Sequence, residues 1–128
     1  MMRNNIVTST ATLGGALLAL VGLVGFFIPN LLGLHLNVGL NLVHLASGAL
    51  ALYFGLKSTS LLAARTFCQA IGVLYTLAGV AGLFDALAMG SGEFALQITE
   101  HLAHLMVGAS FVAAAMIQPL RPASFSPR

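Results

Sequence analysis

Four long apolar stretches, separated by short connections, account for most of this chain. The stretches run from Ile6 to Ile28, from Val38 to Leu56, from Thr66 to Leu87 and from Ile98 to Ile117. A helix that crosses a bilayer needs roughly 20 mainly apolar residues, whereas a core helix of a soluble protein is normally polar on one face. The pattern therefore predicts an all-α integral membrane protein, a bundle of four transmembrane helices.

Composition leads to the same class. Of the 128 residues, 59% are hydrophobic and 6% are charged, against about 25% charged in soluble domains. The first stretch is longer than the roughly 7–15 apolar residues of a signal peptide, so we expect it to be retained. The basic residues are too few and too scattered to follow a phosphate backbone, so no nucleic-acid partner is expected. The single cysteine, Cys68, is expected to be a small core residue.

The charged residues divide between two sides of the predicted bundle. The basic residues lie in the N-terminal segment, in the connection between the second and third stretches, and in the C-terminal segment: Arg3, Lys57, Arg65, Arg121 and Arg128. The acidic residues lie at or near the connection between the third and fourth stretches: Asp85, Glu93 and Glu100. Because basic connections stay in the cytoplasm, we expect a multi-pass protein of the cell (inner) membrane with both termini cytoplasmic.

A repeat relates the two halves of the chain. The segment NLVHLASGA at residues 41–49 returns sixty positions later as HLAHLMVGA. We therefore expect a single domain, residues 1–128, built from two tandem helical-hairpin repeats over residues 6–57 and 62–118, with a short basic tail at residues 119–128. Each repeat holds two spans, so both insert in the same orientation, with a pseudo-two-fold axis along the membrane normal.

Two kinds of helical stripe follow from the repeat. The first is a glycine stripe, typical of membrane helices whose backbones approach closely. Its members are Gly15, Gly22 and Gly25 in the first stretch and Gly72, Gly79 and Gly82 in the third. The second stripe is polar in its outer half. Its members are Asn37, Asn41, His44, Gly48 and Gly55, matched by Gln97, His101, His104, Gly108 and Ala115. Since histidine and asparagine would lack partners in lipid, we expect the two polar stripes to meet near the pseudo-symmetry axis.

The strings NVGLNLVHL (residues 37–45) and EHLAHL (residues 100–105) resemble the paired signatures of a bacterial family catalogued as domain of unknown function 4383. Members of that family are small four-span membrane proteins, so the resemblance implies this fold and no activity. The chain departs from the family pattern at Leu40, Glu100 and His101, where a histidine, an aspartate and an asparagine are expected. The histidine at position 101 adds a second imidazole to the second repeat and weakens any strict two-site symmetry.

The histidines within the spans admit a structural interpretation. In it, His44 and His104 bridge the two repeats or cap the outer helix ends through Asn41, Ser47 and Glu100. A neutral imidazole inside a bundle is tolerated when it is hydrogen-bonded, and interhelical hydrogen bonds in membranes contribute about 0.6 kcal/mol on average. An ionisable residue within a span is nevertheless a functional hypothesis by default.

Two ligand-binding interpretations stand beside the structural one. A transition-metal site would use nitrogen and oxygen donors suited to zinc, copper or iron. Its candidate ligands are His44, His101, His104 and Glu100. A tetrapyrrole site would use His44 and His104 as ligands of haem or a chlorophyll-type pigment, with Gly48 and Gly108 leaving room for the flat macrocycle. The same glycines would also allow close helix crossing.

No enzyme is predicted, because Ser47, the serine that lies near His44, has no oxyanion loop. The leading hypothesis is a structural or accessory subunit in the lipid bilayer, which docks on other membrane-protein subunits or self-associates. In that hypothesis the outer histidines fix helix packing and no cofactor is bound. The alternative is a metal- or tetrapyrrole-binding membrane protein that uses His44 and His104.

Overall fold

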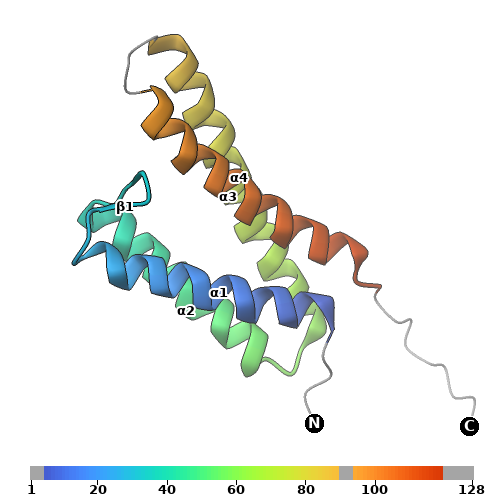
Figure 1. The fold of residues 1–128 in the computed structure, drawn as a ribbon. Helices are drawn as coiled ribbons and strands as arrows, with labels where there is room; N and C mark the ends of the chain where they lie inside the picture. The colour runs from blue at the N-terminus through green and yellow to red at the C-terminus, as the bar shows by residue number, and fades with distance from the viewer. Residues whose placement is uncertain (1–4, 90–93, 120–128) are drawn as a thin grey trace, which may run out of the picture.

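A computed structural model gives the fold of this protein and describes residues 5–89 and 94–119 (Figure 1). These residues form helices and one short β-hairpin, joined by short connections. In chain order the elements are α1 (Ile6–Gly25), β1 (Asn30–Leu31), β2 (Leu34–His35), α2 (Val38–Leu56), α3 (Leu61–Met89) and α4 (Phe94–Ile117). All four helices in this part of the chain are long and apolar enough to cross a membrane. Several residues used to predict the topology lie outside the described residues: Arg3, Glu93, Arg121 and Arg128.

The helix bounds match the apolar stretch at α2 and depart from the stretches elsewhere. α1 ends at Gly25, before its apolar stretch does, because Pro29 lacks an N–H and disfavours helical backbone before it. α3 begins at Leu61, earlier than the apolar pattern predicts. Arg65 does not interrupt α3, since arginine is a good helix former. Its Nε donates a hydrogen bond to the backbone oxygen of Ala115 on α4 at 2.7 Å.

Asparagines cap the N-termini of two helices. The Asn5 side chain accepts a hydrogen bond from the Thr8 N–H, and the Asn37 side chain accepts one from the Leu40 N–H, each at 2.9 Å. Asparagine is a preferred N-cap because it satisfies an N–H that the helix leaves free. Asn37 is exposed, so it caps α2 instead of packing between helices as the stripe predicts.

A β-hairpin joins α1 to α2, and the hydrophobic pattern does not predict it. Its two-residue loop is Leu32 and Gly33, with φ angles of 50° and 84°. Positive φ at both loop positions suits the twist of a tight hairpin, which usually carries Asn-Gly there. Leucine at positive φ is uncommon, so the usual sequence signal is missing. Beyond the hairpin, Leu36 is buried and donates its backbone N–H to the Pro29 oxygen at 2.7 Å.

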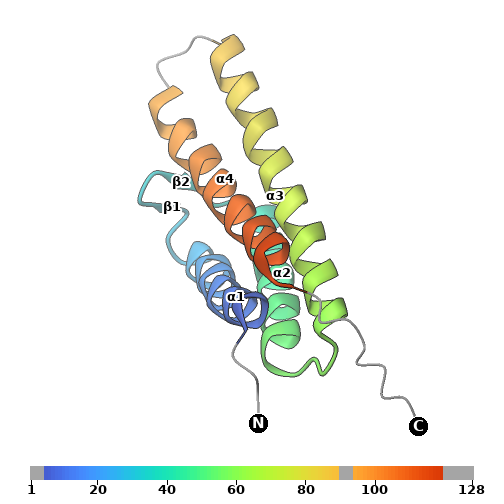
Figure 2. The same ribbon diagram turned by 90° about the vertical axis from the view of Figure 1, so that its right-hand side faces the viewer.

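The closest helix contacts lie within two pairs, α1 with α2 and α3 with α4 (Figures 1 and 2). A Cβ atom added to Gly48 would lie 2.5 Å from the backbone nitrogen of Ala19 on α1, and one added to Gly72 would lie 2.9 Å from the backbone oxygen of Gly108 on α4. Contacts this close require glycine. Backbone atoms of the paired helix crowd further members of the glycine stripe: Gly15, Gly22 and Gly79. The stripes therefore pack inside each helix pair.

The two helix pairs join at a core near the α2–α3 connection and diverge away from it, with the β-hairpin in the opening (Figures 1 and 2). The buried members of this core are Val7, Ala11, Ala51, Ala64, Cys68, Phe111 and Ala115. The rings of Phe54 and Phe67 stack beside them with centroids 4.6 Å apart. Cys68 is a free, buried thiol, as the sequence predicts. The divergence leaves room for polar side chains between the pairs.

Candidate functional site

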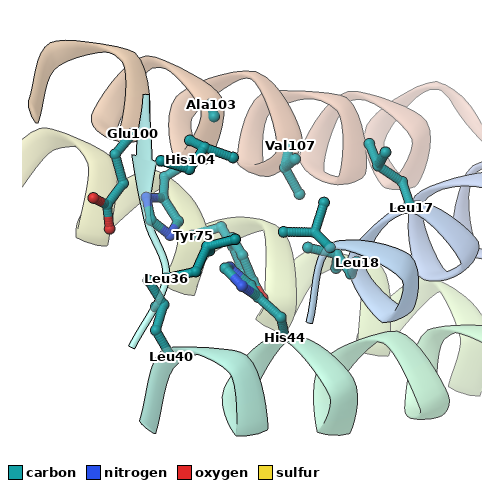
Figure 3. Close-up of a pocket in the computed structure, with 12 residues that line it drawn as sticks. Leu17, Leu18, Leu36, Leu40, His44, Tyr75, Glu100, Ala103, His104 and Val107 are labelled. Atoms are coloured by element: carbon teal, nitrogen blue, oxygen red, sulfur yellow. The ribbon is translucent and has the colours of Figure 1, made fainter. Parts of the chain in front are cut away.

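Three rings from three helices meet between the helix pairs: His44 on α2, Tyr75 on α3 and His104 on α4 (Figure 3). The His44 and His104 rings stack with centroids 5.9 Å apart and planes inclined by 26°. The Tyr75 ring centroid lies 6.2 Å from that of His44 and 5.6 Å from that of His104. These three residues are called the ring cluster below. The cluster brings one histidine of each half of the chain into contact across the two pairs.

A hydrogen bond ties the ring cluster to the serine one turn along α2. Ser47 Oγ lies 2.7 Å from the backbone oxygen of Val43 and 2.7 Å from the Tyr75 hydroxyl oxygen. A serine hydroxyl has one proton and two lone pairs. When that proton is donated to Val43, the Tyr75 hydroxyl donates to Ser47. This bond joins α2 to α3, and it leaves the Tyr75 oxygen free only to accept a further hydrogen bond.

A cavity of about 100 Å³ lies beside the ring cluster. The ring cluster and Glu100 of α4 are among the residues around it (Figure 3), but its surface is almost entirely apolar. The other lining residues are apolar and include Leu17 and Leu18 of α1, Leu36 after the β-hairpin, and Val107 of α4. Every helix and the β-hairpin connection thus contribute to this one space.

The imidazoles of the cluster carry hydrogen-bonding capacity that the protein does not use. Nδ1 of His44 and Nδ1 of His104 are buried and have no partner among the described residues. Buried polar atoms are normally paired, and leaving one unpaired costs about 1–3 kcal/mol. Oδ1 of Asn41 and Nδ1 of His101, which pack against glycines within the helix pairs, are buried without a partner in the same way, so the unpaired nitrogens do not by themselves indicate a ligand.

The cavity is lined by positions that the sequence repeat relates. Leu18 and Tyr75 differ by 57 in number, as the two glycine stripes do, whereas Leu40 and Glu100 differ by 60, as the two histidines of the cluster do. The second half of the chain therefore carries polar groups where the first half carries leucines. Tyr75 was missed by sequence reasoning, because a tyrosine inside an apolar stretch is typical of a core. The available signal was that Tyr75 follows Leu18 by 57 positions, the offset that relates the two glycine stripes.

His101 does not join the ring cluster, which corrects the predicted metal site. Its imidazole lies against Gly82 of α3, and the Asn41 side chain lies against Gly25 of α1. The described part of the chain holds no group of three or more His, Cys, Asp or Glu side chains placed to bind a metal ion. The histidines turn toward different neighbours, so the structure does not assemble the predicted ligand set of His44, His101, His104 and Glu100.

The predicted macrocycle site does not fit the structure either. Gly48 packs against Ala19 of α1, and Gly108 packs against Thr76 of α3, so helix crossing takes up the space that a flat ring would need. The cavity of about 100 Å³ is smaller than the roughly 150 Å³ that encloses one benzene molecule. A haem or a chlorophyll-type pigment is many times larger than benzene. The cavity accommodates only a small group.

No family model, curated protein or solved structure matches this chain. The arrangement of the ring cluster can hold the two helix pairs together, and it leaves a small, almost entirely apolar cavity between them.

Proposed function

We propose that this protein is an integral protein of the cell (inner) membrane and serves as a structural or accessory subunit of a larger membrane complex. Within it, the ring cluster fixes how two hairpins pack. The observation that carries the proposal is the position of the cluster, where rings from α2, α3 and α4 meet between the two helix pairs. Membership of domain of unknown function 4383 is part of the same proposal and adds no activity.

Insertion into a membrane is supported by the side chains that the helices expose. Leu13 is 73% exposed, Met106 72% and Phe27 79%. Large apolar side chains exposed in such number along the helices are unusual for a soluble monomer and suit lipid. The polar groups of the ring cluster face protein, as they must within a bilayer. Lys57 lies at the α2–α3 connection and Glu100 in the second turn of α4, after the α3–α4 connection, so the positive-inside rule favours cytoplasmic termini.

A duplicated hairpin is supported by matched contacts in the two helix pairs. Gly25 lies against Asn41 and Gly82 against His101, at positions that correspond in the repeat. Buried core positions correspond in the same way: Val7 with Ala64, Ala11 with Cys68, and Ala51 with Phe111. Two like-oriented hairpins related by an axis along the membrane normal would bring equivalent positions together at that axis. The stacked pair of His44 and His104 fits this expectation.

The energy available from the ring cluster is sufficient to set the packing of the hairpins. Aromatic pairs contribute about 0.5–1.5 kcal/mol beyond their buried area, and an interhelical hydrogen bond such as that between Ser47 and Tyr75 contributes about 0.6 kcal/mol. Lipid provides no hydrophobic force that would drive the pairs together. The glycine stripes are already used inside each pair. The contacts at the cluster therefore add to the core near the α2–α3 connection in fixing how the two pairs pack.

The accessory role is tested by purifying the protein from its own membranes in mild detergent, then recording its absorption spectrum, its metal content and its migration on a native gel. The proposal expects a colourless, metal-free protein that migrates with larger subunits. It also expects that combining His44→Leu with His104→Leu abolishes this migration, because the hairpins splay. His35→Leu, at an exposed position in β2, is the matched control. A visible absorption band that His44→Ala or His104→Ala removes would overturn the proposal, as would migration of the wild type as a free monomer.

A further inference from the structure

The cavity beside the ring cluster is apolar on almost its entire surface. The unpaired nitrogens of the neighbouring rings, Nδ1 of His44 and Nδ1 of His104, are inaccessible, so they offer a guest no hydrogen bond. A polar group would lose its hydration on entering such a space, and apolar cavities in proteins stay dry and bind apolar molecules. The chemistry of the cavity therefore matches a hydrocarbon group.

The volume of the cavity selects among hydrocarbon groups. At about 100 Å³, it is smaller than the roughly 150 Å³ cavity that encloses one benzene molecule. It therefore excludes rings and accommodates a few methylene groups of a chain. A methyl branch would add volume to a space that the chain already fills, and overpacking forces the walls of a packed core apart. An unbranched chain is the best fit.

One wall of the cavity is also part of the outer surface. Leu17 of α1 lines the cavity and is 52% exposed, and Val107 of α4 lines it and is half-buried. Both side chains stand on the side of the cavity away from Glu100 (Figure 3). Leu20, one turn further along α1, and Met106, next to Val107 on α4, are exposed and apolar as well. In a membrane-inserted chain, a lipid lying against this surface reaches the cavity without crossing water.

The cavity lies between the helix pairs, and both pairs contribute to its wall. Leu18 comes from α1, Leu36 follows the β-hairpin, and Tyr75 and Val107 come from α3 and α4. A hydrocarbon chain in this position contacts both pairs at once, and the attraction grows with the number of atoms in contact. Lipid outside the bundle supplies no hydrophobic force between the pairs. A chain held in the cavity would therefore join the pairs where they diverge.

We propose that this cavity binds the unbranched acyl chain of a membrane lipid, which enters between Leu17 of α1 and Val107 of α4 and packs against Leu18 and Leu36. The bound chain belongs to the interface between the two helix pairs. The inference rests on the membrane insertion that is part of the proposed function, and it requires no partner subunit.

The test uses the full chain, deuterated except for its tyrosine rings, in nanodiscs of dimyristoylphosphatidylcholine. The chain has two tyrosines: Tyr75 is buried and lines the cavity, and Tyr53 is exposed on α2. We expect nuclear Overhauser cross-peaks from both rings to the acyl-chain protons of the lipid. In nanodiscs of diphytanoylphosphatidylcholine, whose acyl chains carry methyl branches, the Tyr75 cross-peak should be lost and the Tyr53 cross-peak should remain.

Variants of the cavity wall locate the bound chain. Ala103→Leu fills the wall on α4 and should abolish the Tyr75 cross-peak, whereas Ala109→Leu, at an exposed position on the same helix, should leave it unchanged. If Ala103→Leu does not fold, Leu18→Ala decides. The larger cavity of Leu18→Ala should admit the branched chain and restore the Tyr75 cross-peak in diphytanoylphosphatidylcholine.

The two tyrosines separate failure of this inference from failure of the proposed function. A Tyr53 cross-peak without a Tyr75 cross-peak in dimyristoylphosphatidylcholine would overturn the bound acyl chain and leave membrane insertion standing. Equal Tyr75 cross-peaks in the two lipids, or an undiminished one in Ala103→Leu, would do the same. A chain that does not enter nanodiscs, and so gives neither cross-peak, would overturn membrane insertion as well.

Discussion

The hydroxyl oxygens of Ser47 and Tyr75 lie 2.7 Å apart, and they connect the α1–α2 pair to the α3–α4 pair. Both groups are buried, so no water competes for this hydrogen bond within the bundle. A further hydrogen bond between the pairs runs from the Cys68 thiol of α3 to the backbone oxygen of Val7 on α1, at 3.9 Å. The Ser47–Tyr75 contact is therefore a direct way to probe how the pairs are held together.

Replacing Tyr75 by phenylalanine should destabilise the protein by about 0.6 kcal/mol, the average for interhelical hydrogen bonds in membranes, and by at most about 1.7 kcal/mol, the largest such value. The ring remains stacked, and Ser47 keeps its bond to Val43, so no hydroxyl is left without a partner. The measurement is the free energy of unfolding by SDS in mixed micelles. Tyr53→Phe, at an exposed tyrosine of α2, is the control. Equal effects of the two substitutions would show that the Ser47 bond contributes nothing.

Gly48→Ala should destabilise the bundle by about 1–3 kcal/mol, because overpacking forces backbones apart. The added methyl group would lie 2.5 Å from the backbone nitrogen of Ala19, and backbone atoms cannot move aside as a flexible side chain can. Gly39→Ala in the same helix is the matched control. A Cβ atom there meets only Asn37 Oδ1, at 3.4 Å, and alanine favours helix by up to about 1 kcal/mol. The two variants should therefore shift the unfolding midpoint in opposite directions.

His44 and His104 should be energetically coupled. A double-mutant cycle with His44→Leu and His104→Leu, read by the same unfolding assay, should give a coupling energy of about 0.5–1.5 kcal/mol, the value expected for a stacked ring pair. A parallel cycle between His44 and the exposed Leu102 should give a coupling energy near zero. Strictly additive effects of the two histidine substitutions would mean that the rings stand near each other without interacting.

His101→Asn should be tolerated without loss of stability beyond about 0.5 kcal/mol, the usual range for substitutions that disturb no packing or pairing. The reason is the matched geometry of the two pairs, in which Asn41 lies against Gly25 as His101 lies against Gly82. The side-chain amide is the smaller group, so it fits where the imidazole does. Thermal unfolding in detergent measures this, with His104→Asn as the comparison. A larger loss at position 101 than at position 104 would indicate that His101 has a role the structure does not show.

The topology should be readable by cysteine labelling in a Cys68→Ala background. Thr59→Cys lies in the α2–α3 connection, and Leu32→Cys lies in the loop of the β-hairpin. With both termini in the cytoplasm, a membrane-impermeant maleimide added to intact cells should label Leu32→Cys and spare Thr59→Cys until the cells are opened. The opposite pattern would place the termini outside, and labelling of both positions in intact cells would refute a fixed orientation.

The helices could be predicted from the sequence because uninterrupted apolar stretches leave few alternatives to a spanning helix. The ends of the helices could not be predicted. α3 continues through Arg65, although this residue interrupts the apolar pattern, and α1 ends at Gly25, before its apolar stretch does, because Pro29 follows. The β-hairpin was also beyond prediction, because Leu32 takes a positive φ that leucine rarely adopts. Local patterns report burial and propensity, whereas these features depend on contacts made in three dimensions.

The candidate site could be predicted only in part for a related reason. Helical periodicity placed Asn41, His44 and Gly48 on one face, but the face is wide enough to serve two neighbours. Asn41 and Gly48 turn to α1, and His44 turns to α3 and α4. His101 and His104 separate in the same manner. Spacing along one helix cannot decide which neighbour each side chain meets, because that depends on the crossing of all four helices.

The glycine contacts join helices that are adjacent in the chain, and this has a consequence for biosynthesis. In a chain inserted into the membrane as proposed, α1 and α2 can associate as soon as both have left the translocon, before α3 is made. At that moment His44 has neither Tyr75 nor His104 beside it and presents a bare imidazole to the acyl chains. Only completion of the second hairpin shields it, so a truncated or misassembled product would carry a polar mark that membrane quality control can recognise.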